Sequence, residues 1–256
     1  MAVADRPEDR LLIFSEEGSE LILFHVLKDV KGGTYVDVGA NDPWDASVTK
    51  LFYERGWSGI NIEPQKKYHD LLLADRPRDV NLCLGAGNCE TELRLWGDGV
   101  GATMDGTVAD RDDVSGHTTV AVMPLTKILN EHLQPGSEIH FCKIDVEGFE
   151  KNVLEGLDLK KYRPWIFVIE SFAFGRASFA QWEHMLTDNG YEFVMNFGLD
   201  RYYLDRKHDL LRDRFLTVER LLGMYSVRSV QVLRPRLPYT RVKDFIWKVF
   251  QKIMNP

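Results

Sequence analysis

The sequence predicts an α/β fold: a mostly parallel seven-stranded sheet with helices on both faces and an antiparallel hairpin at one end. Three observations support this prediction. Short apolar runs alternate along the chain with segments whose apolar residues recur at helical spacing. Most of these runs are separated by the length of a helix, as neighbouring parallel strands require. The last two runs, at 193–196 and 201–204, are close enough in sequence to pair as a hairpin.

The first half of the chain begins with a helix predicted over residues 8–30, broken near Gly18 and stopped by Gly32. The β-branched and aromatic run at 34–38 then predicts the first strand. The elements that follow are a helix at 47–55, a strand at 58–62, a helix at 65–74 and a strand at 80–84.

The stretch from 91 to 122 is less helical. Residues 92–96 and 118–122 alternate like strands, around a glycine-rich loop at 97–106. The periodicity then predicts helices at 125–132, 152–157 and 179–190, and buried strands at 139–144 and 165–169.

Length and composition indicate one large soluble domain with extensions. The chain has 256 residues, of which 44% are hydrophobic and 28% are charged. No apolar run approaches the ~18 residues of a membrane span, and the polar, acidic start does not resemble a secretory signal. The three cysteines lack zinc spacing and are expected to be reduced thiols of a cytoplasmic protein. We expect a helical extension at 1–32, a cofactor-binding domain at 33–205 and a basic tail at 206–256.

Charge is distributed unevenly. The net charge is −7, yet residues 206–256 hold twelve basic and four acidic residues. The acidic main body argues against nucleic-acid binding. Residues 241–254 have the pattern of a basic amphipathic helix. Such a helix docks on its own body, on a partner in a homo-oligomer, or on a membrane surface, which would make the protein peripheral at the inner membrane.

The first strand predicts a site for a nucleoside-bearing cofactor. It ends in Asp37, then Gly39, and the second apolar run ends in Glu63. A glycine lets the backbone approach a ligand, and a carboxylate at the next strand accepts ribose hydroxyl protons. The full dinucleotide fingerprint is absent, because Pro43 has no N–H and Trp44 leaves little room for a pyrophosphate. S-adenosylmethionine fits better than a dinucleotide, which stays open as the alternative.

Carboxylates also end the later strands. Asp145 follows the run at 139–144, Glu147 comes close behind, and Glu170 ends the run at 165–169. Acidic residues commonly cap helices, so each of these alone has a structural explanation. Together they predict acid–base chemistry, with Asp145 as the base or the acceptor-orienting residue in methyl transfer to a hydroxyl. Alternatively, Asp145 binds only the amino-acid part of the cofactor.

Three motifs carry a resemblance to a known family: Val36-Asp37-Val38-Gly39-Ala40-Asn41, Ile62-Glu63-Pro64, and the stretch from Lys143 to Glu150. Over residues 33–205 the chain resembles FkbM-type S-adenosylmethionine-dependent methyltransferases. The resemblance implies a class I methyltransferase fold, which is Rossmann-like, and methylation of hydroxyls of sugars or natural products. Asp42-Pro43 departs from the commoner family pattern at the methionine end.

The resemblance also implies roles for single residues. The methionine part would lie beside the loop after the first strand, the ribose at Glu63, the adenine beside Gly85 and Ala86, and the methyl group near Asp145. Residues 101–103 would form a loop over the site or, alternatively, a plain surface loop. The predicted cofactor-binding residues are Asp37, Gly39, Ala40, Asn41, Glu63, Pro64, Gly85, Ala86 and Asp145, and the predicted catalytic residues are Asp145, Glu147 and Glu170.

The expected function is therefore O-methylation, most simply of a sugar in a surface polysaccharide or glycolipid. Small metabolites or proteins are alternative acceptors, and a nucleotide-binding oxidoreductase or a non-catalytic Rossmann-like module are the other classes. No residue is assigned as a metal ligand. Mg²⁺ assistance is a further alternative, because Asp145 and Glu170 end neighbouring strands and Mg²⁺ prefers oxygen ligands.

Overall fold

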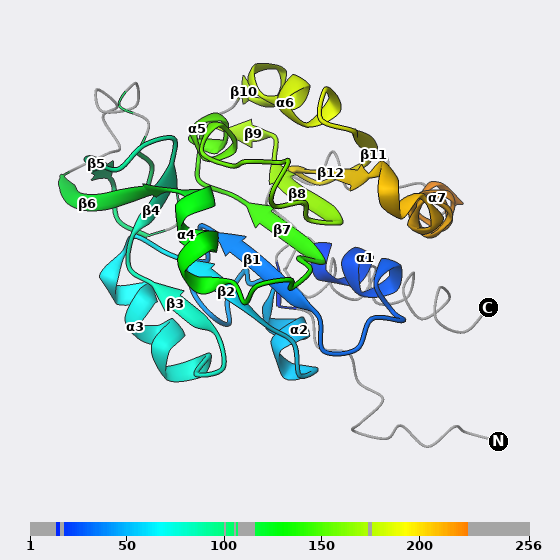
Figure 1. Ribbon diagram of the computed structural model, residues 1–256, viewed down its shortest axis with the longest axis horizontal. Helices are drawn as coiled ribbons and strands as arrows, with labels where there is room; N and C mark the ends of the chain where they lie inside the picture. The colour runs from blue at the N-terminus through cyan, green and yellow to red at the C-terminus, as the bar shows by residue number, and fades with distance from the viewer. Residues whose placement is uncertain are drawn as a thin grey trace.

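The main structural feature of the computed structural model is a seven-stranded sheet in the order β11-β12-β8-β7-β1-β2-β3 (Figure 1). The structure describes residues 14–15, 18–99, 101–104, 106, 116–173 and 176–224. The strands of this sheet are β1 (Thr34–Val38), β2 (Ser58–Ile62), β3 (Val80–Leu82), β7 (Phe141–Ile144), β8 (Ile166–Glu170), β11 (Tyr191–Phe197) and β12 (Asp200–Asp205).

Strands β1, β2, β3, β7 and β8 are parallel, whereas β12 is antiparallel to both β8 and β11. The predicted fold class and the terminal hairpin are thus confirmed. The second strand of the hairpin is inserted between β8 and β11, so the sheet edge is β11. The chain runs outward from β1 to β3 and then returns to β7 on the other side of β1. This reversal creates a crevice at the carboxyl ends of β1 and β7.

Helices cover both faces of the sheet, because residues along each strand alternate between two cores. In β1, Tyr35 packs into the first core, while Val36 and Val38 pack into the second. The first core is covered by α1 (Ser19–Val26), α2 (Lys50–Glu54) and α7 (Arg212–Met224). The second core is covered by α4 (Leu125–His132), α5 (Glu150–Glu155) and α6 (Glu183–Thr187), preceded by η3 (Phe179–Gln181).

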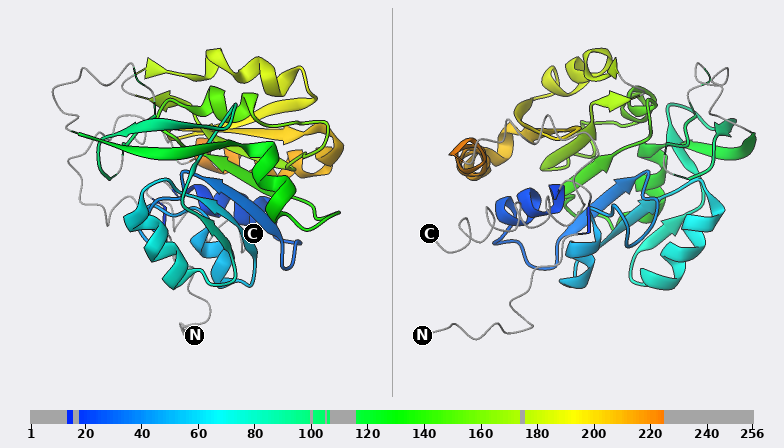
Figure 2. Two further views of the ribbon diagram at one scale, coloured as in Figure 1. Left: turned by 60° about the vertical axis from the view of Figure 1, so that its left-hand side comes forward. Right: turned by 180° about the vertical axis from the view of Figure 1, so that it is seen from behind.

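A second, three-stranded sheet stands beside the carboxyl ends of the main strands. It is formed by β4 (Gly85–Gly87), β5 (Thr91–Trp96) and β6 (His117–Pro124), and it lies near α3 (Lys66–Asp75), at the end of the molecule opposite α7 (Figure 2). The strand predicted at 80–84 is therefore shorter than expected: β3 ends at Leu82, and the chain then enters the second sheet. A short pair, β9 (Phe172–Ala173) and β10 (Arg176–Ala177), follows β8.

The helix predicted at 47–55 begins only at Lys50. The preceding loop is held in an irregular conformation by Arg76, whose side chain is fully buried. Its guanidinium donates to the carbonyl oxygen of Pro43 at 2.6 Å and to the hydroxyl of Ser47 at 3.0 Å. It also donates to the hydroxyl of Thr49 at 3.3 Å. These long-range contacts outweigh the local helical pattern.

Both ends of the described chain pack against the sheet. Of the helix predicted at 8–30, the structure contains α1, which ends at Val26, four residues before the predicted end; residues 8–13 and 16–17 lie outside the described part. After β12 the chain forms η4 (Arg206–Leu211) and then α7, which places Phe215 and Val218 in the first core. The basic helix predicted at 241–254 lies outside the described residues, so its docking or membrane role stays a prediction. No helix within the described ranges is long and apolar enough to span a membrane.

Candidate functional site

The carboxyl ends of β1, β2 and β7 face the second sheet (Figure 1). A cleft is lined by residues from both of these parts. It holds about 750 Å³ of empty space, its open mouth included. The cleft is lined by the loops after β1, β2 and β7, by β4, and by the glycine-rich segment that precedes Met104. Of the predicted cofactor-binding residues, eight line the cleft: Gly39, Ala40, Asn41, Glu63, Pro64, Gly85, Ala86 and Asp145.

The loop after β1 is packed tightly against the loop after β7. Gly39 has a φ of 79°, and a Cβ atom on it would lie 1.9 Å from the carbonyl oxygen of Asp145. No side chain fits there. The sequence predicted this glycine because of the cofactor; the structure adds a requirement within the protein itself. Asn41 is also left-handed, with a φ of 51°, a conformation that asparagine tolerates better than most residues.

Glu63 is almost fully buried at the floor of the cleft, and its carboxylate is fixed by two backbone amides. Asn41 donates to Oε2 at 2.8 Å and Gln65 donates to Oε1 at 2.7 Å. Burial raises the pKa of Glu63, and these two hydrogen bonds oppose the rise. Each oxygen keeps a further lone pair. The oriented carboxylate can therefore accept the two hydroxyl protons of a ribose.

Asp37 is not among the described residues that line the cleft. It is buried on the opposite face of β1, where the hydroxyl of Thr49 donates to Oδ2 at 2.8 Å. Its Oδ1 lies 3.5 Å from Nζ of Lys143, which does line the cleft. Asp37, predicted to bind the cofactor, thus reaches the cleft only through its contact with Lys143.

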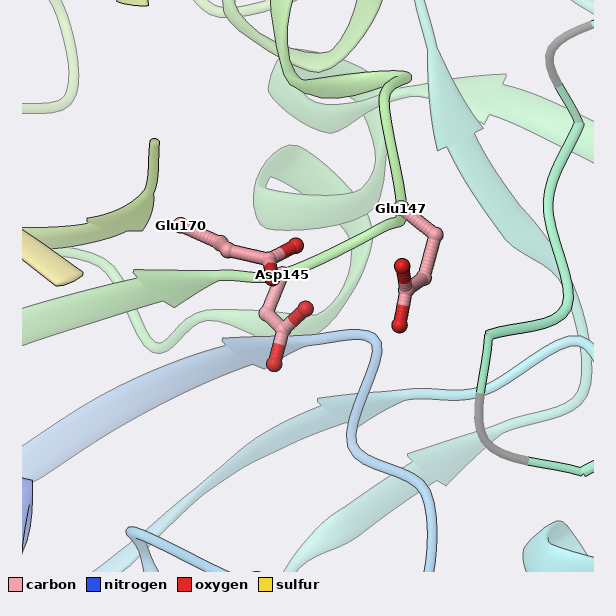
Figure 3. Close-up of side chains that lie close together, drawn as sticks. All are labelled: Asp145, Glu147 and Glu170. Carbon is pink, nitrogen blue, oxygen red and sulfur yellow. The ribbon is translucent and has the colours of Figure 1, made fainter. Parts of the chain in front are cut away.

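Three carboxyl groups meet beside the cleft: Asp145 and Glu147 from the loop after β7, and Glu170 from the end of β8 (Figure 3). One oxygen of each lies within 4.8 Å of the others. Asp145 and Glu147 line the cleft. Glu170 is buried behind them, and its Oε2 has no hydrogen-bond partner among the described residues. The structure therefore brings together the three residues predicted to be catalytic.

Burial and mutual repulsion change the acidity of this cluster. Burial, followed by the charge of Asp145, raises the pKa of Glu170 far above its usual range and raises that of Glu147 to about 7. Glu170 is thus a neutral carboxylic acid at pH 7 that can donate a hydrogen bond to Asp145. Glu147 is close to its titration midpoint at neutral pH, as suits a general base. The set of three oxygens would also suit Mg²⁺, which prefers oxygen ligands.

Glu147 also holds the segment that covers the cleft, which we call the strap (residues 97–99 and 101–104). Thr103 donates its hydroxyl to the carbonyl oxygen of Glu147 at 2.6 Å, and the amide of Gly101 donates to the Glu147 carboxylate. At the other end, Gln65 forms two hydrogen bonds with the backbone of Gly99, at 2.8 and 3.1 Å. Gly101, Ala102 and Met104 of the strap line the cleft. The predicted loop over the site is thus placed over it and held at both ends.

One side of the cleft is apolar. Ile62, Ala86, Leu95 and Met104 line it, and Ala86 is almost fully buried. Gly85 lies against the strap, because a Cβ on it would come within 2.8 Å of Sδ of Met104. A flat aromatic ring can be enclosed between such side chains.

Sequence reasoning missed two residues of this site. Lys143 was noted only as part of a motif, although a lysine inside the apolar run at 141–144 is itself a signal, because buried lysines are usually paired. Gln65 was missed because its partner, Gly99, is distant in sequence and nothing local marks it.

Comparison with known proteins gives one family model and a solved structure that are similar to this chain. A family model described as the methyltransferase FkbM domain matches residues 37–193, more than half of the chain. Among solved structures, the chain is similar to the crystal structure of methyltransferase FkbM from Methylobacillus flagellatus KT, with 15% identity and a TM-score of 0.44. That alignment covers 79% of this chain and 46% of the other, so this chain spans less than half of that protein. No curated protein matches it.

Proposed function

This chain belongs to the methyltransferase FkbM family, and we propose that it transfers a methyl group from S-adenosylmethionine to a hydroxyl group. The observation that carries the proposal is the arrangement of one cleft. Glu63, oriented by two amides, lies on one side, and the Asp145 and Glu147 carboxyls lie on the other. Both ends of an adenosine-linked amino acid thus have a suitable partner within one cleft.

The residues of the cleft fit this donor. Glu63 would bind the ribose, the apolar side near Met104 would hold the adenine, and the loop containing Gly39 would lie beside the methionine part. S-adenosylmethionine supplies a methyl group on a positively charged sulfur, and S-adenosylhomocysteine is the other product. The strap lines one side of the cleft, where it would shield a bound donor from part of the solvent.

We assign the general base to Glu147. As the acceptor oxygen bonds to the methyl carbon, its proton must pass to a base within reach. Asp145, the base favoured by the sequence, is already engaged with Lys143, 3.3 Å away. Glu147 lines the same cleft, and its pKa of about 7, raised by burial, leaves much of it deprotonated at neutral pH. Glu170, as a neutral acid, would position Asp145.

Family resemblance supports a sugar hydroxyl as the acceptor, in a surface polysaccharide or glycolipid. The test is transfer of a labelled methyl group from S-adenosylmethionine to a panel of glycans, glycolipids, small hydroxylated metabolites and proteins. Incorporation into a glycan, lost in Glu147→Gln and kept in the exposed control Glu155→Gln, is the expected result. Incorporation of the label only into a metabolite or a protein would show that the acceptor belongs to that class and is not a glycan or glycolipid.

Binding measurements separate this proposal from its rivals. By calorimetry, S-adenosylhomocysteine should bind the protein and NAD⁺ should not. NAD⁺ binding without S-adenosylhomocysteine binding would favour an oxidoreductase. Binding of S-adenosylhomocysteine without turnover of any acceptor in the panel would favour a non-catalytic module.

A further inference from the structure

Lys143 provides a fixed positive charge at one end of the cleft. It is the third residue of β7, and its side chain is only 9% exposed. Its Nζ lies 3.2 Å from the carbonyl oxygen of Gly39, 3.3 Å from Oδ2 of Asp145 and 3.5 Å from Oδ1 of Asp37. Asp37 is held in turn by Thr49. The ammonium group is therefore fixed in position before any ligand arrives.

The charge of Lys143 is secure at neutral pH. Burial opposes the ammonium charge, but the carboxylates of Asp145 and Asp37 outweigh it and raise the pKa of the lysine. Among the described residues that line the cleft, Lys143 is the one basic side chain. Any anionic group of a ligand in this cleft has its natural partner there.

We infer that Lys143 and Asp145 together recognise the amino-acid end of the methyl donor: Lys143 binds its carboxylate and Asp145 binds its ammonium group. The inference rests on the proposed function. A zwitterion needs one cation and one carboxylate side by side, and in the cleft these two groups are 3.3 Å apart. An amino acid inserted between them replaces one ion pair with two, so neither side chain loses its partner.

The surroundings of the pair favour this exchange. Asp145 is 36% exposed on its side chain, so it can turn toward a ligand, while Lys143 stays anchored by Gly39 and Asp37. Glu63 stands at the ribose end of the same cleft, fixed by its own amides. The donor would therefore be bound at its ribose by Glu63 and at its amino acid by Lys143 and Asp145, and these contacts would fix the position of the sulfur between them.

Two product-like ligands test the inference by calorimetry on the full chain. S-adenosylhomocysteine has the amino acid, and 5′-methylthioadenosine is an adenosine thioether without it. We expect wild-type protein to bind the former more tightly. Lys143→Met should weaken S-adenosylhomocysteine binding by about 10- to 100-fold, as expected for loss of a charged hydrogen bond, and leave methylthioadenosine binding within about 3-fold. Lys151→Met, on the exposed side of α5, is the matched control and should change neither.

Asp145→Asn provides a second arm, because removal of a buried cation can unfold the protein. It should weaken S-adenosylhomocysteine binding and spare methylthioadenosine binding. Equal losses for both ligands, or unchanged S-adenosylhomocysteine affinity in both variants, would overturn the inference. Equal affinity of the wild-type protein for the two ligands would do so as well. Failure of the wild type to bind either ligand would instead refute the proposed function.

Discussion

Gly39 and Asp145 touch so closely that a methyl group on the first would lie 1.9 Å from the carbonyl oxygen of the second. The loops after β1 and β7 are therefore locked together by backbone contact. This contact places the cofactor loop and the carboxyl cluster at a fixed separation.

Gly39→Ala should destabilise the protein strongly. Gly136 provides the control, because it also has a positive φ, 81°, but no atom lies within 4 Å of its missing Cβ. We expect Gly136→Ala to cost about 1 kcal/mol, the conformational penalty alone. Gly39→Ala adds a clash with backbone and should cost roughly 3 kcal/mol or more. Urea unfolding measures both; equal losses would show that the loops can separate without penalty.

Activity should rise with pH through neutrality. Burial raises the pKa of Glu147 to about 7, and a general base acts only when deprotonated, so kcat/KM should increase from pH 6 to pH 8. Glu147→Gln should lower kcat by about 10²- to 10⁴-fold and flatten the profile. Glu155→Gln, exposed on α5, should keep both the rate and the profile. A wild-type profile that is flat across this range would assign the base elsewhere.

Methyl transfer should continue in excess EDTA. We expect the carboxyl cluster to work through proton transfer, since Glu170 is neutral at pH 7 and Glu147 titrates near it. The assay compares initial rates before and after chelation, with Mg²⁺ added back. If activity falls on chelation and returns with Mg²⁺, then Asp145, Glu147 and Glu170 hold a cation, as their spacing allows.

Arg76 should be among the most important residues for stability. It is fully buried, and it donates to Pro43, Ser47 and Thr49, which form the loop before α2. Arg76→Met would leave the nearby buried Asp79 without its cation, 3.9 Å away, and should cost about 3–5 kcal/mol. Arg94→Met, exposed on β5, is the comparison and should change the unfolding free energy by less than about 0.5 kcal/mol.

Gln65→Ala should loosen the strap. The variant loses both hydrogen bonds to Gly99, each worth about 0.5–1.5 kcal/mol, so affinity for S-adenosylhomocysteine should fall roughly 5- to 150-fold through faster dissociation. Gln134→Ala changes an exposed glutamine after α4 and should have no effect. Unchanged dissociation in Gln65→Ala, measured by stopped flow, would mean that the strap is held without this contact.

The parts of the site that sequence predicted are those that lie at strand ends. Glu63, Asp145 and Glu170 each follow an apolar run, and parallel strands bring such ends to one edge of the sheet. The predicted FkbM family is confirmed by the family model, and the predicted sheet with its antiparallel hairpin is confirmed by the strand order. Asp37 follows the same pattern, yet its side chain points to the opposite face.

The parts that could not be predicted depend on contacts between distant residues. The strap is held by Gln65 and Glu147, and the delayed start of α2 follows from Arg76. The run at 80–84 predicts one strand, but the strand of the main sheet ends at Leu82, and the chain begins a strand of the second sheet at Gly85. In each case tertiary contacts override a local pattern.

The two contacts that Glu147 makes with the strap have a consequence for the timing of catalysis. Its carboxylate accepts the Gly101 amide, and the same group would receive the proton of the acceptor. A protonated carboxyl is a weaker hydrogen-bond acceptor than a carboxylate. Protonation of Glu147 at the end of the reaction would therefore weaken its hydrogen bond to the strap and favour release of the products. Amide hydrogen exchange at Gly99 and Gly101 should then slow less between pH 8 and pH 6 than the intrinsic pH dependence of amide exchange predicts. Protonation of one carboxyl group, that of Glu147, would thus serve both methyl transfer and product release.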